Sequence, residues 1–242
     1  MSRLILLRHG QSVYNCEDRL TGWTDVDLTT RGIEEAHEAA RRLSEGEIEF
    51  DVALTSVLKR AIRTLLIVLE DLDRMWIPVE SSWRLNEQHY GALQGRRKPE
   101  IAREYGHKQF HLWRRGFTVR PPALSENDPR HPRFDRRYSD IGMADLPSAE
   151  CLREALRRLL PLWHRSIVPR LRAGSSVLLV GHGTIFRGLM KHLRRVPYPR
   201  VRDFELPTGV PLVVELNAEL DMVTSRYLNG SDNILSGRDA IS

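Results

Sequence analysis

The chain has 242 residues, of which 41% are hydrophobic and 29% are charged, with a net charge of +5. This balance excludes an intrinsically disordered chain, and the apolar runs are only strand-sized, so we expect neither a membrane span nor a signal peptide. Cys16 and Cys151 have no metal-ligand spacing around them, which argues against a zinc site or a disulfide framework and favours a cytoplasmic location.

The first half of the chain alternates buried strands with amphipathic helices. Residues 4–7 and residues 51–55 are each predicted to form a strand. The helix between them begins after Thr29 and Thr30, whose hydroxyl groups can cap it. Ser56 is expected to cap the helix that follows the second strand.

The same alternation returns after residue 150. Residues 152–163 carry an apolar stripe at helical spacing, and residues 176–180 predict another buried strand with a helix behind it. Residues 210–216 and 222–227 are predicted to be two closing strands, and the last dozen residues are expected to be frayed. This order of elements is typical of an α/β fold with a largely parallel sheet.

Periodicity weakens between residues 84 and 147, where Pro121, Pro122, Pro129 and Pro132 fall among polar and charged residues. Long irregular segments in compact domains are often lids. We therefore expect one domain over residues 1–242, with a lid-like insertion at about residues 84–147.

A guanidinium and an imidazole directly follow the first strand, in the tripeptide Arg8, His9 and Gly10. Ligands of open α/β sheets bind beyond the carboxyl ends of the strands, and a glycine lets an anion approach the backbone, so this edge suits phosphate. A histidine that is simply packed in a loop explains the tripeptide equally well.

His182 and Gly183 repeat the arrangement after another buried strand. If the two strands are neighbours in a parallel sheet they lie about 4.8 Å apart, so both imidazoles can reach one phosphorus atom. One histidine can then attack while the other donates hydrogen bonds to the oxygens of the transferring group.

Arg60 adds a second guanidinium in the first turns of the helix after residues 51–55. Two arginines and a helix N-terminus can hold phosphoryl oxygens without a metal. The alternative is a solvated helix charge, because Lys59 and Arg63 lie beside it.

Glu87 is a lone acid among polar and glycine residues at the start of the insertion, and it can act as a general acid and base for a substrate hydroxyl. Lys98, Arg114 and Arg115 lie where a folded-over lid can meet a second anionic group. A surface salt bridge for Glu87 and a solvated basic face for the other three are the alternatives.

Six stretches together carry a family resemblance, and they are residues 7–12, 21–28, 55–61, 87–95, 113–117 and 207–212. They resemble the cofactor-dependent phosphoglycerate mutases of the histidine phosphatase superfamily, over nearly the whole chain. The Arg-His-Gly tripeptide marks only the superfamily, whereas residues 86–95 and 113–117 are more specific to the mutases.

The resemblance implies a three-layer fold whose six-stranded, mostly parallel sheet has helices on both faces. It implies an isomerase that interconverts 3-phosphoglycerate and 2-phosphoglycerate through phosphorylated His9, primed by 2,3-bisphosphoglycerate and needing no metal. The expected partners are small anionic phosphoglycerates and further copies of the chain, in a homodimer or homotetramer.

Position by position, the resemblance implies that Arg8, Arg60 and His182 surround the phosphoryl group and that Glu87 handles the proton. The substrate-binding positions that it implies are Asn15, Thr21, Gly22, Tyr90, Lys98, Arg114, Arg115, Gly183 and Thr184. Several positions depart from the pattern, with Gln11, Ala149, Cys151 and Thr184 standing where the family usually has Glu, Thr, Ser and Asn.

Two other functions stay open. A phosphatase acting on small phosphate esters shares the phosphohistidine and differs only in the acceptor of the phosphoryl group. A non-catalytic binding protein, using its basic surface for nucleic acid, would have little reason to keep both histidines and Glu87 together. The sequence contains no recognised nucleic-acid motif, so we expect no such partner.

Overall fold

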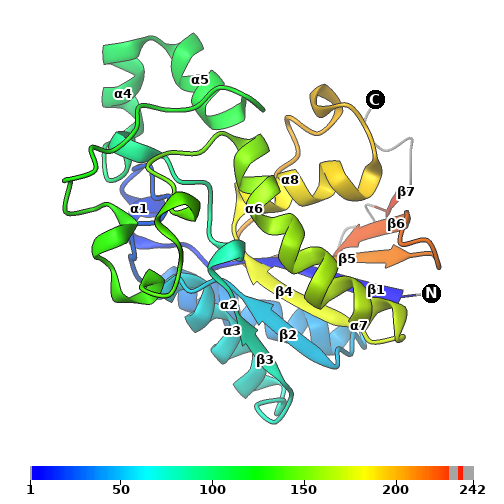
Figure 1. Ribbon diagram of the computed structural model, residues 1–242. Coiled ribbons are helices and arrows are strands. Elements are labelled where there is room, and N and C mark those ends of the chain that lie inside the picture. The colour runs from blue at the N-terminus through cyan, green and yellow to red at the C-terminus, as the bar shows by residue number, and fades with distance from the viewer. Residues whose placement is uncertain (1, 229–233, 237–242) are drawn as a thin grey trace.

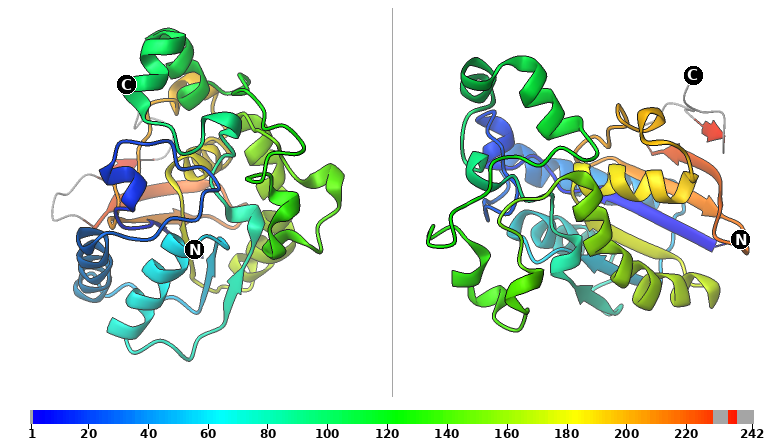
Figure 2. Two further views of the ribbon diagram at one scale, coloured as in Figure 1. Left: turned by 90° about the vertical axis from the view of Figure 1, so that its left-hand side faces the viewer. Right: turned by 45° about the horizontal axis from the view of Figure 1, so that its top comes forward.

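The computed structural model describes residues 2–228 and 234–236. Most of the dozen C-terminal residues that we expected to be frayed lie outside these ranges. The described residues form a central sheet with helices on both faces, as Figure 1 and Figure 2 show. No helix among them is long and apolar enough to cross a membrane.

The sheet has the strand order β3-β2-β4-β1-β5-β6-β7. Neighbours are parallel from β3 to β1 and antiparallel from β1 to β7. The predicted six-stranded, mostly parallel sheet is confirmed, and β7 adds one short strand at its edge. The strands are β1 (Ser2–Arg8), β2 (Val52–Thr55), β3 (Val79–Ser81), β4 (Val177–Gly181), β5 (Pro211–Leu216), β6 (Met222–Tyr227) and β7 (Ile234–Ser236).

Helices cover both faces of the sheet, with α2 and α3 packed on one side and α6 and α8 on the other. A π-helical turn at Trp163–Ile167 joins α6 to α7. The helices are α1 (Val13–Cys16), α2 (Thr30–Glu45), α3 (Lys59–Asp71), α4 (Lys98–Tyr105), α5 (His107–Arg115), α6 (Leu152–Leu162), α7 (Val168–Arg172) and α8 (Gly183–Arg194).

Strand β1 shows why an unbroken apolar run forms a strand here. Leu4 and Leu6 belong to the core beneath α6 and α8, while Ile5 and Leu7 belong to the core beneath α2 and α3. Successive side chains of a strand point to opposite faces, so a strand covered on both faces has no polar position. All four side chains are fully buried.

The two predicted helix caps have different outcomes. The Thr29 side chain accepts a hydrogen bond from Gly32 N, so it caps α2 as expected. The prediction for Ser56 is wrong, because α3 begins at Lys59 after Leu58, which gives no side-chain cap. The Lys59 amide instead donates to an Asp25 carboxylate oxygen at 2.6 Å.

The insertion at residues 84–147 is less irregular than its sequence indicates. It contains α4 and α5, which Figure 1 shows beyond the carboxyl ends of the strands. Phe110 and Trp113 of α5 pack with Leu20 and Tyr90 in a small cluster of their own. Short helices of eight and nine residues leave little periodicity to detect. The insertion also holds single 3₁₀ turns at Gly91–Leu93, Pro132–Phe134, Arg136–Tyr138 and Met143–Asp145.

Two further single turns complete the described helical structure, at Trp83–Leu85 and Tyr198–Arg200. The first leads from β3 into the segment that carries Glu87, and the second lies between α8 and β5.

Candidate active site

A polar pocket lies where β1 and β4 end, under the insertion. These strands are hydrogen-bonded neighbours, and Arg8 is paired with Gly181, so the residues that follow them meet at one edge. All the predicted site residues line the pocket except His182, which lies directly beside His9. The pocket is also lined by Arg19, Leu20, Arg187, Glu205 and Leu206, which the sequence did not identify.

His9 is held in one orientation by two contacts. Its Nδ1 lies 2.7 Å from the Gly10 carbonyl oxygen, and Arg60 Nε donates to its Nε2 at 3.2 Å. Because a carbonyl accepts only, Nδ1 carries the proton and Nε2 keeps its lone pair. Burial, together with the charges of Arg60 and Arg8, lowers the pKa of His9 well below its usual value. The ring is therefore neutral and able to act as a nucleophile at neutral pH.

His182 lies next to His9, with 5.1 Å between the ring centroids. Its Nε2 is 2.8 Å from Ser56 Oγ, which also accepts from the Leu58 amide at 3.3 Å. When Ser56 donates its hydroxyl proton to Nε2, the ring proton of His182 lies on Nδ1. That Nδ1 is buried and has no hydrogen-bond partner among the described residues. Burial, Arg60, His9 and Arg8 lower the pKa of His182 well below its usual value.

Arg60 is a cation inside the protein, only 1% exposed. Its Nη1 donates to Thr24 O at 2.9 Å and its Nη2 to Gly22 O at 2.8 Å, so the backbone of one loop fixes the guanidinium against His9. Burial lowers its pKa to about 10, which leaves it charged at neutral pH.

Arg8 provides the second cation, and it is half-buried. Its Nη1 donates to Leu206 O at 3.0 Å, while its Nε is buried without a partner among the described residues. Burial also lowers the pKa of Arg8. Among the described residues, Arg8 and Arg60 donate to carbonyl oxygens and to the neutral His9 ring and to no carboxylate, so the two cations favour binding of an anion.

Glu87 caps helix α8 with its carboxylate. One oxygen accepts from the Thr184 amide and the other from the Ile185 amide, each at 3.2 Å, and the Gln88 amide donates at 2.8 Å. Glu87 is therefore not the surface salt bridge that the sequence left open. The helix N-terminus that we expected to hold a phosphate belongs to α3, and its Lys59 amide donates to Asp25.

Thr184 does not take the helix-capping role that its hydroxyl suits. The N-cap position of α8 is occupied by His182, and Thr184 Oγ1 lies 3.1 Å from the hydroxyl of Tyr90. Burial raises the pKa of Tyr90, so this phenol is neutral. Because one of these hydroxyl groups donates to the other, the pair leaves one neutral O–H donor beside the charged arginines.

The outer basic residues reach the pocket, but most are already paired. Lys98 Nζ donates to Asp18 at 2.6 Å, and Arg115 forms an ion pair with Glu205. Arg114 lies over the Phe110 ring, with 5.5 Å from its guanidinium carbon to the ring centroid. Burial and the neighbouring arginines lower the pKa of Arg115 to about 10.

Asn15, Thr21 and Gly22 shape the near wall of the pocket. Asn15 Oδ1 accepts from the Ser12 amide at 3.1 Å, which closes the first turn of α1. Gly22 has a φ of 54°, and a Cβ atom there would lie 2.1 Å from the Gln94 side-chain oxygen. Only glycine fits this position without strain, and its carbonyl oxygen is thereby directed to Arg60.

The site residues that the sequence did not identify differ in whether a local sequence pattern could have indicated them. Arg187 follows Gly183 by one helical turn, so i to i+4 spacing on α8 could have found it. Glu205 and Ser56 carry no local signal, because their partners are far away in the sequence. Ser56 meets His182 only after β2 and β4 have paired.

The fold and the pocket define an α/β protein with a polar pocket lined by several arginines, beside two neighbouring histidines at the carboxyl edge of parallel strands. The sequence matches the histidine phosphatase superfamily (branch 1) over residues 4–138 and 124–225. The chain belongs to this superfamily, which confirms the broader part of the predicted family.

Solved structures of known proteins share the fold at low sequence identity. Mycobacterial glucosyl-3-phosphoglycerate phosphatase is 22% identical with a TM-score of 0.70, covering 94% of this chain and 97% of its own. Alpha-ribazole phosphatase from Shigella flexneri is 23% identical with a TM-score of 0.66, covering 91% and 93%. Bacillus stearothermophilus YhfR is 25% identical with a TM-score of 0.68, covering 92% and 94%.

Proposed function

We propose that this protein transfers phosphoryl groups through a phosphorylated His9, and that its substrates are small phosphate esters with a second acidic group. The observation that carries the proposal is the state of His9. It is a buried, neutral imidazole whose Nε2 lone pair faces the Arg60 guanidinium. A nucleophile held against a cation favours attack on an electrophilic group that carries negative charge.

The chemistry balances without another reagent. His9 Nε2 forms a bond to phosphorus as the ester P–O bond breaks, and Glu87 gives its proton to the departing oxygen. In the second half, an acceptor hydroxyl attacks the phosphohistidine and returns its proton to Glu87. Arg8, Arg60 and His182 stabilise the charge on the phosphoryl oxygens throughout.

Hydrolysis is one candidate outcome, with water as the acceptor. Two of the structural neighbours described above are named as phosphatases, and one of these names includes a phosphoglycerate group. These names favour the phosphatase alternative. At identities below 25% they support the fold directly and the activity only as a suggestion.

Isomerisation is the second candidate, with a substrate hydroxyl as the acceptor. It is favoured by the lid residues, because Lys98, Arg114 and Arg115 all line the pocket that holds His9. A mutase must hold a phosphate and a carboxylate at once, and this cluster supplies the second binding position. The resemblance to phosphoglycerate mutases over residues 86–95 and 113–117 points to the same activity.

The mutase candidate also needs a priming phosphoryl donor, and 2,3-bisphosphoglycerate fits the residues present. The buried, unpartnered Arg8 Nε and His182 Nδ1 suit one phosphate, and the lid arginines suit the remaining acidic groups. When bound, this compound would supply the phosphoryl group that His9 accepts. Independence from metal ions is part of the same proposal, and a cytoplasmic location remains a prediction from cysteine usage.

One incubation separates the candidates. The purified protein is mixed with 3-phosphoglycerate, with and without 2,3-bisphosphoglycerate and with and without a chelator, while 2-phosphoglycerate and free phosphate are followed together. Hydrolysis releases phosphate alone, whereas isomerisation yields 2-phosphoglycerate and depends on the bisphosphate. Absence of both products, with no phosphorylated His9, would refute the proposed function.

A further inference from the structure

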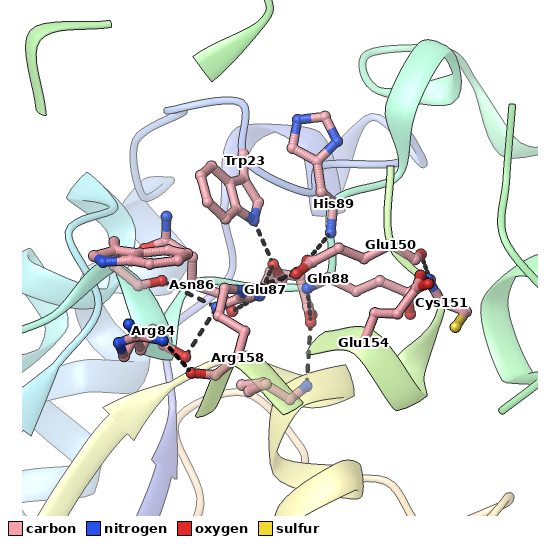
Figure 3. Close-up of polar contacts among 12 residues, drawn as sticks. Trp23, Arg84, Asn86, Glu87, Gln88, His89, Glu150, Cys151, Glu154 and Arg158 are labelled. Carbon is pink, nitrogen blue, oxygen red and sulfur yellow. Dashed lines mark hydrogen bonds and ion pairs between the residues drawn. The ribbon is translucent and has the colours of Figure 1, made fainter. Parts of the chain in front are cut away.

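Figure 3 centres on a buried ion pair between Arg158, in α6, and Glu150, just before that helix. Arg158 Nε lies 2.7 Å from Glu150 Oε1, and Nη2 lies 3.0 Å from Oε2. Each side chain is only 5% exposed. Apolar residues of similar volume often stabilise a core at least as well as a buried ion pair does, so packing alone does not account for it.

Arg158 donates to a row of backbone carbonyl oxygens around Glu87. Nη1 reaches Trp83 O at 3.0 Å and Arg84 O at 2.9 Å. Nη2 reaches Asn86 O and Glu87 O, both at 3.1 Å. One guanidinium therefore ties down the backbone on the N-terminal side of Glu87 and the carbonyl of Glu87 itself.

Glu150 holds the other side of the same segment. Its Oε2 accepts from the His89 amide at 2.9 Å, and its own amide donates to His89 O at 2.8 Å. The Gln88 side chain donates to Glu150 O at 2.7 Å. Trp23 Nε1 adds a bond to Glu87 O at 2.7 Å, and the guanidinium of Arg158 lies over the Trp23 ring.

Among the described residues, the carboxylate of Glu87 accepts from the amides of Gln88, Thr184 and Ile185, and neither Arg158 nor Glu150 contacts it. The network fixes the backbone from which the carboxylate projects, as Figure 3 shows for the residues around it. A proton-transfer group loses much of its effect when it is misplaced by about 1 Å, so rigid support of its backbone has catalytic value.

We propose that Arg158 and Glu150 are positioning residues that hold Glu87 where it exchanges a proton with the substrate oxygen. The inference rests on the proposed function, in which Glu87 protonates the departing oxygen. The proposal predicts that loss of the Arg158 and Glu150 pair slows only those reactions whose leaving group needs a proton from Glu87.

The leaving group of the substrate tests this directly. The nitrophenolate of a nitrophenyl phosphate leaves without a proton. The alkoxide oxygen of an alkyl ester such as 3-phosphoglycerate requires one. The rate of His9 phosphorylation is measured in the first turnover by rapid mixing, so that the later fate of the phosphohistidine does not enter. Glu87→Gln sets the reference pattern, with a large loss on the alkyl ester and little on the nitrophenyl ester.

Arg158→Lys keeps the charge but cannot reproduce the row of donors. We expect the rate of His9 phosphorylation by the alkyl ester to fall about 10-fold to 100-fold, which is a fraction of what a proton shuttle contributes. The rate with the nitrophenyl ester should change by less than about threefold. Arg157→Lys is the matched control, because Arg157 is the exposed neighbour on the same helix. It should change neither rate. Adding Arg158→Lys to Glu87→Gln should cause no further loss.

Equal losses of Arg158→Lys on both esters would overturn the proposal, because general damage to the pocket acts on both. Glu150→Gln, which retains the side-chain volume, should reproduce the selective loss. Near-ultraviolet circular dichroism of Trp23 and Trp83 reports whether each variant is folded, and unfolding of both would also overturn the proposal by making the pair purely structural. A wild-type protein inactive on both esters would instead contradict the proposed function itself.

Discussion

At the scale of single residues, the pocket is defined by which nitrogen of each histidine carries a proton. Gly10 O fixes the proton of His9 on Nδ1, and Ser56 assigns that of His182 to Nδ1 as well. One ring therefore presents a lone pair and the other an unpaired donor. The two histidines therefore differ in role, one as nucleophile and one as hydrogen-bond donor, because their hydrogen-bond partners differ.

His9→Ala is expected to abolish both phosphoenzyme formation and turnover. His182, the imidazole beside His9, does not line the pocket, so His9 is the imidazole that a substrate there can reach. The measurement is acid-labile, base-stable phosphate on the protein after incubation with a labelled ester. Label retained on the variant would show that another residue is the nucleophile.

Ser56→Ala is expected to slow phosphoryl transfer by about tenfold, since it removes the hydrogen bond that sets the tautomer of His182 and one such bond contributes about 0.5 to 1.5 kcal/mol. Thr55→Val is the control, because the Thr55 hydroxyl is buried beside it and has no partner among the described residues. Nitrogen chemical shifts of the His182 ring measure the tautomer. An unchanged tautomer in Ser56→Ala would disprove the assigned role.

At the scale of elements, the pocket is closed by helix α5 from the insertion and by the segment between α8 and β5. The two meet through the Arg115 and Glu205 ion pair, with a further bond from the Tyr198 hydroxyl to Arg115 O at 2.6 Å. A substrate carboxylate that binds Arg115 competes with Glu205. This contact therefore affects substrate affinity more than the chemical step.

Glu205→Gln is expected to lower the KM for substrates with a second acidic group by no more than about fivefold, and to leave kcat unchanged. The limit follows from exposure, because Glu205 is 60% exposed and ion pairs of this kind contribute about 0 to 1 kcal/mol. Steady-state kinetics with 3-phosphoglycerate measures the change, and nitrophenyl phosphate, which lacks a second acid, is the control. An equal change with both substrates would contradict the competition.

At the scale of the whole molecule, four buried histidines link stability to pH, because the pKa of each is lowered by burial, and they are His9, His89, His131 and His182. The pKa values of His9 and His182 lie well below the usual value, and burial with nearby cations lowers that of His89 to about 3. In the unfolded chain these side chains titrate near pH 6.5. Below that pH the unfolded state binds more protons than the folded state, so acid favours unfolding.

We therefore expect the free energy of unfolding to fall as the pH drops below about 6.5, by up to about 1.4 kcal/mol per pH unit for each of these histidines. Denaturant titrations between pH 7.5 and about pH 5 measure the slope. His89→Gln should make the slope shallower by one such contribution. A slope that His89→Gln leaves unchanged would show that His89 is not neutral in the folded protein.

The expected self-association also belongs to this scale. Strand β3 forms the edge of the sheet, and near it Trp76 is 76% exposed and Met75 is 58% exposed. Exposed apolar groups beside an open edge strand favour pairing with a second copy. We expect a homodimer in sedimentation equilibrium and a monomer for Trp76→Glu. A wild-type monomer at high concentration would contradict this surface.

Local patterns were sufficient for much of this protein. The buried strand before His9, the second histidine after another strand and the capping Thr29 all follow from side chains within a few positions of one another. The resemblance then indicated most of the residues that line the pocket, but not Arg19, Leu20, Arg187, Glu205 and Leu206. Short helices such as α4 and α5 escaped detection, because about two turns carry too little periodicity.

Contacts between distant segments were decided by the tertiary structure alone. Ser56 meets His182 across 126 positions, and Arg158 reaches the backbone of Glu87 across 71. Glu205 lies opposite Arg115 only because the segment after α8 returns over the pocket. Backbone carbonyl groups are identical at every residue, so no sequence pattern marks which of them a buried guanidinium will find. Charge and nucleophile identity are therefore local properties, whereas their orientation and pairing arise only when the sheet has formed.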